Sequence, residues 1–145
     1  MPKFGKTSKE RRELLCKDLK RLVDEVIKEY DFSIICTHRS KDEQERAWSY
    51  GYTNAKFMQS AHNTCPAFAV DVYPYPVPYR QNKGIKELDD NSPMWDEMIK
   101  VFKTKAKELG IKITCGIDFK SIKDSPHIEI KNWREIVKNI WQYCY

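Results

Sequence analysis

The sequence predicts an α+β fold, a single domain over residues 1–145 with a small, mainly antiparallel sheet flanked by helices. Segments with apolar residues at three- and four-residue steps predict the helices, and short β-prone apolar segments between them predict the strands. The two kinds of segment do not alternate as in a βαβ protein, which argues against a parallel sheet. A length of 145 residues suits one domain.

One long helix is expected near the N-terminus. Thr7 and Glu10 have the spacing of a capping box. Apolar residues then recur at helical steps for about six turns; they are Leu14, Leu15, Leu19, Leu22, Val23, Val26, Ile27 and Tyr30. A strand is expected at Phe32–Thr37, and Ser40 followed by Glu43 predicts an N-cap for the charged stretch after it.

Three further strands are predicted, at Phe68–Tyr73, Ile111–Cys115 and His127–Ile130. Residues 73–93 contain four prolines and show no helical period, which predicts a long loop of a kind that often serves as a lid or binding loop.

Two more amphipathic helices are expected in the second half of the chain. Met94–Leu109 has an apolar stripe and is expected to end at Gly110. Asn132, with Glu135 three residues later, predicts the start of a last helix. Its apolar residues are Trp133, Ile136, Val137, Ile140 and Trp141.

Composition narrows the class of protein. Hydrophobic residues make up 41% of the chain, as in a folded globular protein, and no run of about 18 apolar residues predicts a membrane span. The N-terminus has no apolar secretory segment, so the protein is expected to be made in a cytoplasm and its five cysteines to be free thiols. A net charge of +5 favours polyanionic partners, although basic residues spread along the chain are also typical of a solvated surface. Because no nucleic-acid-binding motif is present, nucleic acid is not expected as a partner.

Histidine is scarce, and two of the three histidines lie in unusual surroundings. His62 shortly precedes the strand that carries Asp71 between two valines, and His127 begins the last strand. A carboxylate in an apolar strand is costly unless it is paired or bound to a metal. Two imidazoles and a carboxylate are a frequent ligand set of catalytic zinc, with a fourth position for water. Since no His-Glu-x-x-His motif is present, spacing alone leaves open hydrogen-bonded structural histidines and a salt-bridged Asp71.

An ordered set of motifs resembles the M15 peptidases, the group of D-alanyl-D-alanine carboxypeptidases and phage L-alanyl-D-glutamate endopeptidases. The family shares a Ser-x-His segment, an Ala-Val-Asp strand and an Asp-x-Pro-His segment. This chain has them as Ser60-Ala61-His62, Ala69-Val70-Asp71 and Asp124-Ser125-Pro126-His127. Arg39-Ser40, Glu43-Gln44 and the stretch Cys115-Gly116-Ile117-Asp118-Phe119 match further elements, so the resemblance covers nearly the whole chain.

The resemblance implies a D-Ala-D-Ala carboxypeptidase-like, Hedgehog-like fold and a site that holds Zn²⁺. It implies that His62, Asp71 and His127 are the metal ligands and that Asp124 is the catalytic base. Glu129 is the rival base, because residues two apart in a strand face the same side; it alternatively orients a ligand.

Arg39 is expected to bind a substrate carboxylate or the developing oxyanion, unless it forms a surface salt bridge instead. Ser60 and Gln44 are expected to bind substrate. His38 is expected to be structural, and Asp118 to support its loop.

Two departures from the family pattern concern the site. Six residues separate His62 from Ala69, which indicates a two-residue insertion without the usual glycine and brings Cys65 near the metal as a competing ligand. Cys115 and Phe119 stand where the family usually has tryptophans.

The resemblance therefore implies a phage endolysin that cuts the L-alanyl-D-glutamate bond of peptidoglycan. The alternatives are a D-alanyl-D-alanine carboxypeptidase and a non-catalytic basic module that binds wall polymer or nucleic acid. The enzyme is expected to be a monomer without a separate wall-binding domain, reaching the wall after release at lysis.

Overall fold

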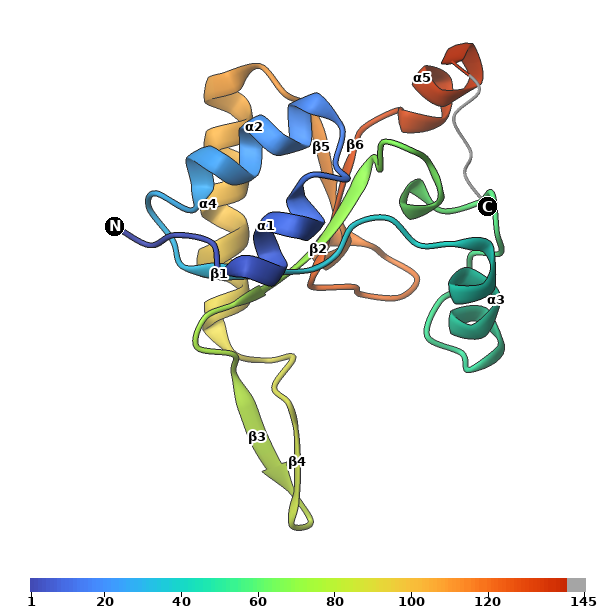
Figure 1. The fold of residues 1–145 in the computed structure, drawn as a ribbon. Coiled ribbons are helices and arrows are strands. Elements are labelled where there is room, and N and C mark those ends of the chain that lie inside the picture. Colours follow the sequence, from blue (N-terminus) through green and yellow to red (C-terminus); the bar gives the residue numbers. More distant parts are fainter. Residues whose placement is uncertain (141–145) are drawn as a thin grey trace.

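A four-stranded antiparallel sheet with the order β1–β2–β6–β5 forms the centre of the fold (Figure 1). The structure is a computed structural model, and it describes residues 1–140. The elements are α1 (Lys6–Arg12), α2 (Lys17–Val26), β1 (Phe32–Cys36), α3 (Lys41–Ser49), η1 (Ala61–Asn63), β2 (Ala69–Pro74), β3 (Tyr79–Asn82), β4 (Ile85–Leu88), α4 (Pro93–Leu109), β5 (Ile113–Cys115), η2 (Gly116–Asp118), β6 (His127–Ile130) and α5 (Trp133–Ile140). The predicted α+β fold is confirmed.

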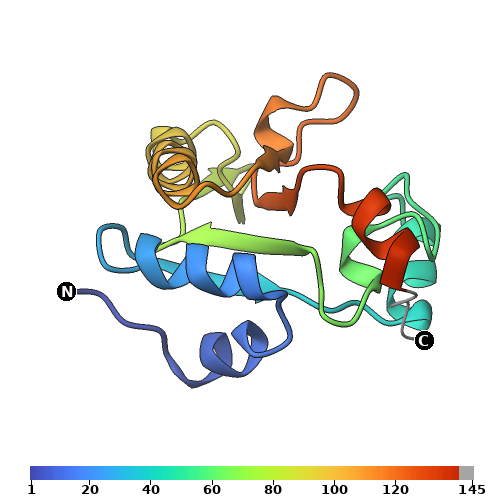
Figure 2. The ribbon, with the colours of Figure 1, turned by 90° about the horizontal axis from the view of Figure 1, so that it is seen from above.

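The helices form two groups, one at each end of the sheet. Helix α2 packs against α4, which contacts β2 and β5, whereas α1 packs against β1. Figure 2 shows α3, η1 and α5 together at the end of the molecule opposite α2 and α4. The core between α2, α4 and the sheet contains Leu19, Leu22, Ile34, Trp95 and Phe102, each at most 1% exposed.

Local sequence signals explain the ends of α3 and α4. Ser40 accepts a hydrogen bond from the Glu43 backbone amide, and the Glu43 carboxylate accepts one from the Ser40 amide, which completes the predicted capping box. Helix α4 begins with Ser92 as N-cap and Pro93 in its first turn. It ends at Gly110, whose φ of 71° is the left-handed conformation that glycine tolerates best.

Strand register brings three polar side chains into one row. Cys36 of β1 pairs with Asp71 of β2, after an irregularity in β1 between Ile34 and Cys36. Asp71 pairs in turn with His127 of β6. Residues directly opposite each other in a sheet have side chains on the same face. The candidate site is therefore built across three strands.

The single N-terminal helix predicted over about six turns is wrong, because it is two helices. The chain leaves the helix after Arg12, and its backbone pairs with Ala67: the Cys16 amide donates to the Ala67 carbonyl, and the Ala67 amide donates to the Leu14 carbonyl. The predicted capping box at Thr7 is also wrong, since the N-cap of α1 is Gly5, without a side-chain cap.

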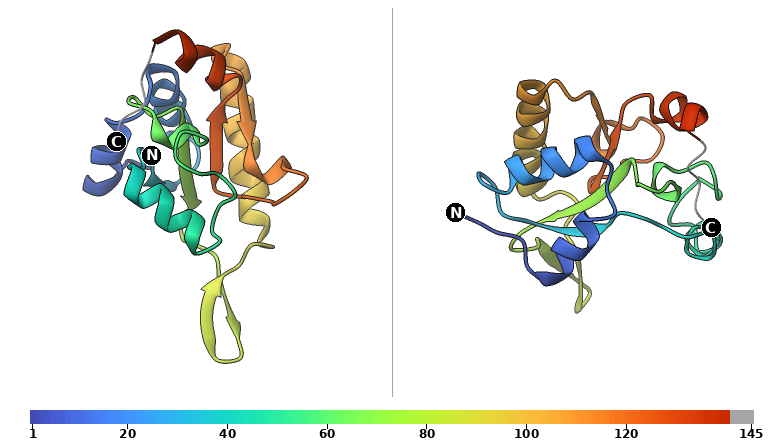
Figure 3. Two further views of the ribbon diagram at one scale, coloured as in Figure 1. Left: turned by 90° about the vertical axis from the view of Figure 1, so that its right-hand side faces the viewer. Right: turned by 45° about the horizontal axis from the view of Figure 1, so that its top comes forward.

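The segment predicted as a loop at residues 73–93 contains a β-hairpin. Strands β3 and β4 pair around Lys83 and Gly84, which have φ angles of 51° and 80°. Two consecutive residues with positive φ form the kind of two-residue turn that suits the twist of a hairpin. The hairpin extends away from the rest of the molecule (Figure 3).

The cysteine prediction is wrong at Cys65, which is disulfide-bonded. Cys16, Cys36 and Cys115 are free. The predicted roles of Trp141 in the last helix and of Cys144 as a free thiol lie outside the described residues. Within the described residues, no helix is long and apolar enough to cross a membrane.

Candidate active site

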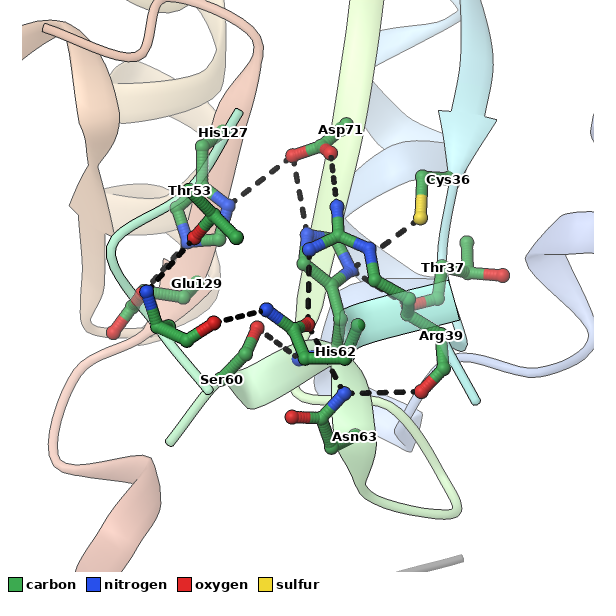
Figure 4. A network of polar contacts seen from close by, with 12 residues as sticks. Cys36, Thr37, Arg39, Thr53, Ser60, His62, Asn63, Asp71, His127 and Glu129 are labelled. Carbon is green, nitrogen blue, oxygen red and sulfur yellow. Dashed lines mark hydrogen bonds and ion pairs between the residues drawn. The ribbon is translucent and has the colours of Figure 1, made fainter. Parts of the chain in front are cut away.

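Two histidines converge on one carboxylate oxygen. His62 Nε2 lies 3.2 Å from Asp71 Oδ1, and His127 Nδ1 lies 3.1 Å from the same oxygen (Figure 4). The centroids of the two imidazole rings are 5.2 Å apart. His62 comes from η1, Asp71 from β2 and His127 from β6. The fold thus brings together three residues that are far apart in the sequence.

The far nitrogen of each imidazole has its own hydrogen-bond partner. His62 Nδ1 donates to the Thr37 carbonyl at 2.7 Å, and His127 Nε2 donates to Glu129 Oε1 at 2.7 Å. Each contact fixes the orientation of the ring and directs the other nitrogen toward Asp71. Such a partner on the distal nitrogen is typical of histidines that bind metals. Glu129 therefore faces the site through His127.

Burial and the neighbouring charges shift the pKa of each group in this cluster in opposite directions. Burial alone would lower the pKa of His62, but the negative charge of Asp71 raises it. Asp71 and Glu129 likewise raise the pKa of His127 against the effect of burial. The two imidazoles keep the pKa of Asp71 well below its usual range despite its desolvation. The three groups form one coupled electrostatic unit.

The cluster offers donor atoms that suit a zinc ion. Cys36, His62 and Asp71 have donor atoms within 4.8 Å of one another, and so do Asp71, Asp124 and His127. Two imidazole nitrogens and one carboxylate oxygen, each ring anchored from behind, form a ligand set that fits Zn²⁺.

Of the free cysteines, Cys36 belongs to this cluster, with Sγ 3.8 Å from His62 Nδ1. Cys36 was not among the predicted site residues. Residues two apart in a regular strand face the same side, but the irregularity between Ile34 and Cys36 turns Cys36 to the face of Asp71, so the strand pattern alone did not indicate it. Cys65, the predicted competing ligand, is in a disulfide and offers no thiolate.

Asp124 reaches the cluster from the loop before β6. Its backbone amide donates to the Gly116 carbonyl at 2.9 Å, and its carbonyl accepts from the His127 amide at 3.1 Å. Loss of water around the carboxylate, together with the charge of Asp71, raises the pKa of Asp124. Gly116 permits this approach, since a Cβ there would clash with the Asp124 carbonyl and lie 2.9 Å from His127 Cβ.

Arg39 is held beside Asp71 by a polar network. Its Nη2 lies 3.6 Å from Asp71 Oδ2, and its Nη1 donates to Gln44 Oε1 at 3.0 Å. Gln44 also donates to the Ala55 carbonyl, and Asn63 donates to both Gln44 and the Arg39 carbonyl. Gln44 is fully buried, so its contacts are with Arg39 and with the surrounding loops.

The remaining predicted residues differ in their relation to the cleft. Ser60 lines the cleft, and its hydroxyl accepts from the His62 amide at 3.2 Å. Asp118 forms an ion pair with Lys103 at 2.7 Å, away from the cluster. His38 lies outside the cluster, with a buried Nε2 for which the described residues provide no hydrogen-bond partner.

A cavity of about 360 Å³ lies in front of the cluster. It is lined by the charged and imidazole residues of the site and by further residues that are not among the predicted site residues. The latter include Tyr52, Thr53, Phe119, Trp133 and Arg134. They come from three separate segments, and only the folded chain brings them together. A peptide of a few residues fits a cleft of this size and polarity.

Comparison with known proteins identifies the family. The family model of phage L-alanyl-D-glutamate peptidases matches residues 1–134. The fold is similar to the crystal structure of the Serratia marcescens L-Ala D-Glu endopeptidase ChiX, with a TM-score of 0.68 and 22% sequence identity over 89% of each chain. No match is found among curated proteins. Since the family model covers all but the last 11 of 145 residues, the chain belongs to the phage L-alanyl-D-glutamate peptidase family and is a peptidoglycan-degrading peptidase.

Proposed function

We propose that the chain is a zinc-dependent endopeptidase that hydrolyses the L-alanyl-D-glutamate bond of the peptidoglycan stem peptide. His62, Asp71 and His127 are the proposed zinc ligands. The observation that carries the proposal is the convergence of His62 Nε2 and His127 Nδ1 on one Asp71 oxygen, with both distal nitrogens anchored. A bound zinc ion supplies a Lewis acid that polarises the scissile carbonyl and makes water a usable nucleophile at neutral pH.

Asp124 is the proposed catalytic base. Hydrolysis adds water across the peptide bond, so one proton must leave the water and one must reach the amine of D-glutamate as the C–N bond breaks. The Asp124 carboxylate lines the cleft close to the proposed ligands, and its raised pKa suits a group that first accepts and then returns a proton.

Arg39 is the proposed binder of negative charge. Its guanidinium lines the cleft and is oriented by Gln44 and Asp71. From there it stabilises either the oxygen of the scissile carbonyl as charge develops or a carboxylate of the substrate. We propose that Ser60 contributes to substrate binding at the cleft wall, and that Gln44 acts by positioning Arg39.

Glu129 is the alternative base, but its hydrogen bond to His127 Nε2 favours an orienting role. The Glu129 carboxylate is already hydrogen-bonded to His127 on the far side of the imidazole. Within residues 1–140, the Asp124 side chain makes no hydrogen bond to His127.

We further propose that the enzyme acts as a monomeric catalytic domain, is made in the host cytoplasm and reaches the wall at lysis. The family's substrate, peptidoglycan, lies outside the cytoplasmic membrane. The net charge of +5 supports attraction to the anionic wall.

The test is digestion of purified peptidoglycan with mass spectrometry of the fragments, with and without a chelator. We expect new D-glutamate amino termini, their loss with the chelator, and their return when zinc is added. Release of terminal D-alanine alone would assign a carboxypeptidase instead. Cleavage that persists in the chelator would contradict the zinc proposal.

A further inference from the structure

A second cavity opens directly from the catalytic cleft. Its volume is about 310 Å³, and it lies between residues 51–55 and residues 119–124. Tyr52, Thr53, Phe119 and Asp124 line both cavities. Because Asp124 is shared, a ligand in the second cavity lies beside the proposed catalytic base. The proposed zinc ligands do not line this cavity, so the peptidase proposal leaves it without a role.

Tyr52 lines this cavity, and Tyr50 lies beside Tyr52; both tyrosines have most of their surface in solvent. Tyr50 is 69% exposed and Tyr52 is 82% exposed, and their ring centroids are 5.8 Å apart. Gly51, with φ of 76°, lies between them, and the Tyr52 amide donates back to the Ala47 carbonyl at the end of α3. The tight turn thus holds both rings outward. Since they contribute little to the core, folding does not explain them, and neighbouring exposed aromatic residues often mark a binding surface.

The walls of the cavity combine the Tyr52 ring with polar groups. Asn54, Ser121 and Lys123 line it together with the apolar side chains of Phe119 and Ile122. A sugar ring has an apolar face of C–H groups and a rim of hydroxyls. Aromatic faces beside hydrogen-bonding side chains match both parts of such a ligand.

The chemistry of the substrate places a sugar close to the scissile peptide bond. In peptidoglycan, the amino group of the stem L-alanine is joined through a lactyl group to a muramic acid residue of the glycan strand. One residue spans at most about 3.6 Å, so one alanine and the lactyl link keep the sugar within roughly 10 Å of the scissile carbonyl. A peptidase that cuts after this alanine must accommodate the glycan strand next to its cleft.

We propose that the cavity between residues 51–55 and 119–124, with Tyr52 in its wall and Tyr50 beside Tyr52, binds the saccharide of the glycan strand. This proposal rests on the proposed function for its substrate geometry. The saccharide stacks on the tyrosine rings and hydrogen-bonds to the polar wall, and it thereby presents the first peptide bond of the stem to Asp124.

Two measurements test the proposal on Tyr50→Ala and Tyr52→Ala, with Tyr79→Ala as the matched control. Tyr79 is 52% exposed and belongs to the distant β3–β4 hairpin. The first measurement is kcat/KM on a disaccharide-linked stem peptide and on the same peptide without sugar. The second is an NMR binding titration of the protein as purified with soluble, peptide-free glycan strands, which requires no catalysis.

We expect wild type to prefer the disaccharide-linked substrate, and each of the two tyrosine variants to lose about fivefold to tenfold in kcat/KM on it through a higher KM. The same variants should lose less on the sugar-free peptide than on the disaccharide-linked substrate, and they should bind the glycan strands more weakly by a similar factor. Tyr79→Ala should match wild type throughout.

Glycan binding that is absent in wild type, or equal in all variants, would overturn the proposal. Wild type that cleaves neither substrate but binds glycan strands through the two tyrosines would support the saccharide site and contradict the peptidase proposal. The two failures are therefore distinguishable.

Discussion

At the scale of single residues, the site depends on which atom of each side chain is already engaged. His62 and His127 each use one nitrogen to hold position and leave the other facing Asp71. The side chain of Asp124 takes no part in these hydrogen bonds of the three proposed ligands. Its carboxylate should therefore be removable without loss of the metal.

Asp124→Asn should lower kcat by about 100-fold to 10,000-fold, the usual contribution of a positioned base. Zinc content, measured by atomic emission, should stay at one ion per chain because the proposed ligands are intact. Zinc retention together with unchanged turnover would contradict the role of Asp124.

Glu129→Gln is the matched comparison. Loss of its contact with His127 should weaken zinc binding by about 10-fold to 100-fold. Activity should largely return when zinc is added in excess, since the base remains. Near-normal turnover in Asp124→Asn, together with a Glu129→Gln enzyme that excess zinc does not rescue, would exchange the two roles.

Zinc binding should also depend on pH. The pKa values of His62 and His127 are raised in the metal-free protein, so both imidazoles hold protons at neutral pH that the metal must displace. Protons compete more strongly as the pH falls, and the zinc affinity should drop by up to about 100-fold per pH unit if two protons leave. Competition titration with a zinc indicator between about pH 6 and 7.5 measures this, and an affinity that does not change with pH would contradict the coupling.

At the scale of elements, the turn that includes Gly116 decides where Asp124 and His127 lie. Strand β5 passes into η2 at this residue, and the loop before β6 returns over it so closely that a side chain has no room. The Asp124 amide and the Gly116 carbonyl are hydrogen-bonded across this contact.

Gly116→Ala should therefore displace the base and one proposed ligand together. We expect destabilisation of about 1–3 kcal/mol, the cost of overpacking, and a loss of more than about 10-fold in kcat, since small misplacements of catalytic groups are costly. Gly5→Ala is the control, because a Cβ there meets no atom within 4 Å. Thermal unfolding and turnover measure the two effects, and a Gly116→Ala enzyme as active as Gly5→Ala would refute the positioning argument.

The elements that sequence could predict are those specified by local signals. The capping residues of α3 and α4 and the alternation in the strands depend on neighbours within a few residues. The break after α1 could not be predicted, because it results from backbone pairing with Ala67, which is distant in the sequence. The β3–β4 hairpin had a local signal in Lys83-Gly84, which the proline-rich surroundings obscured.

At the scale of the whole molecule, the order of short motifs was sufficient to select the residues that converge. It selected His62, Asp71 and His127, which the pairing of β2 with β6 and the position of η1 bring together. The motifs did not reveal Tyr52 or Arg134 as lining residues of the cleft, since these belong to segments whose proximity only the fold determines.

We propose that a single zinc ion binds to His62 Nε2, Asp71 and His127 Nδ1. The most direct measurement is a crystal structure of the zinc-loaded protein with anomalous scattering recorded at the zinc edge. We expect a single strong peak about 2.0–2.2 Å from these three donors. A peak at the thiolate of Cys36 without His127, or no peak near Asp71, would contradict it.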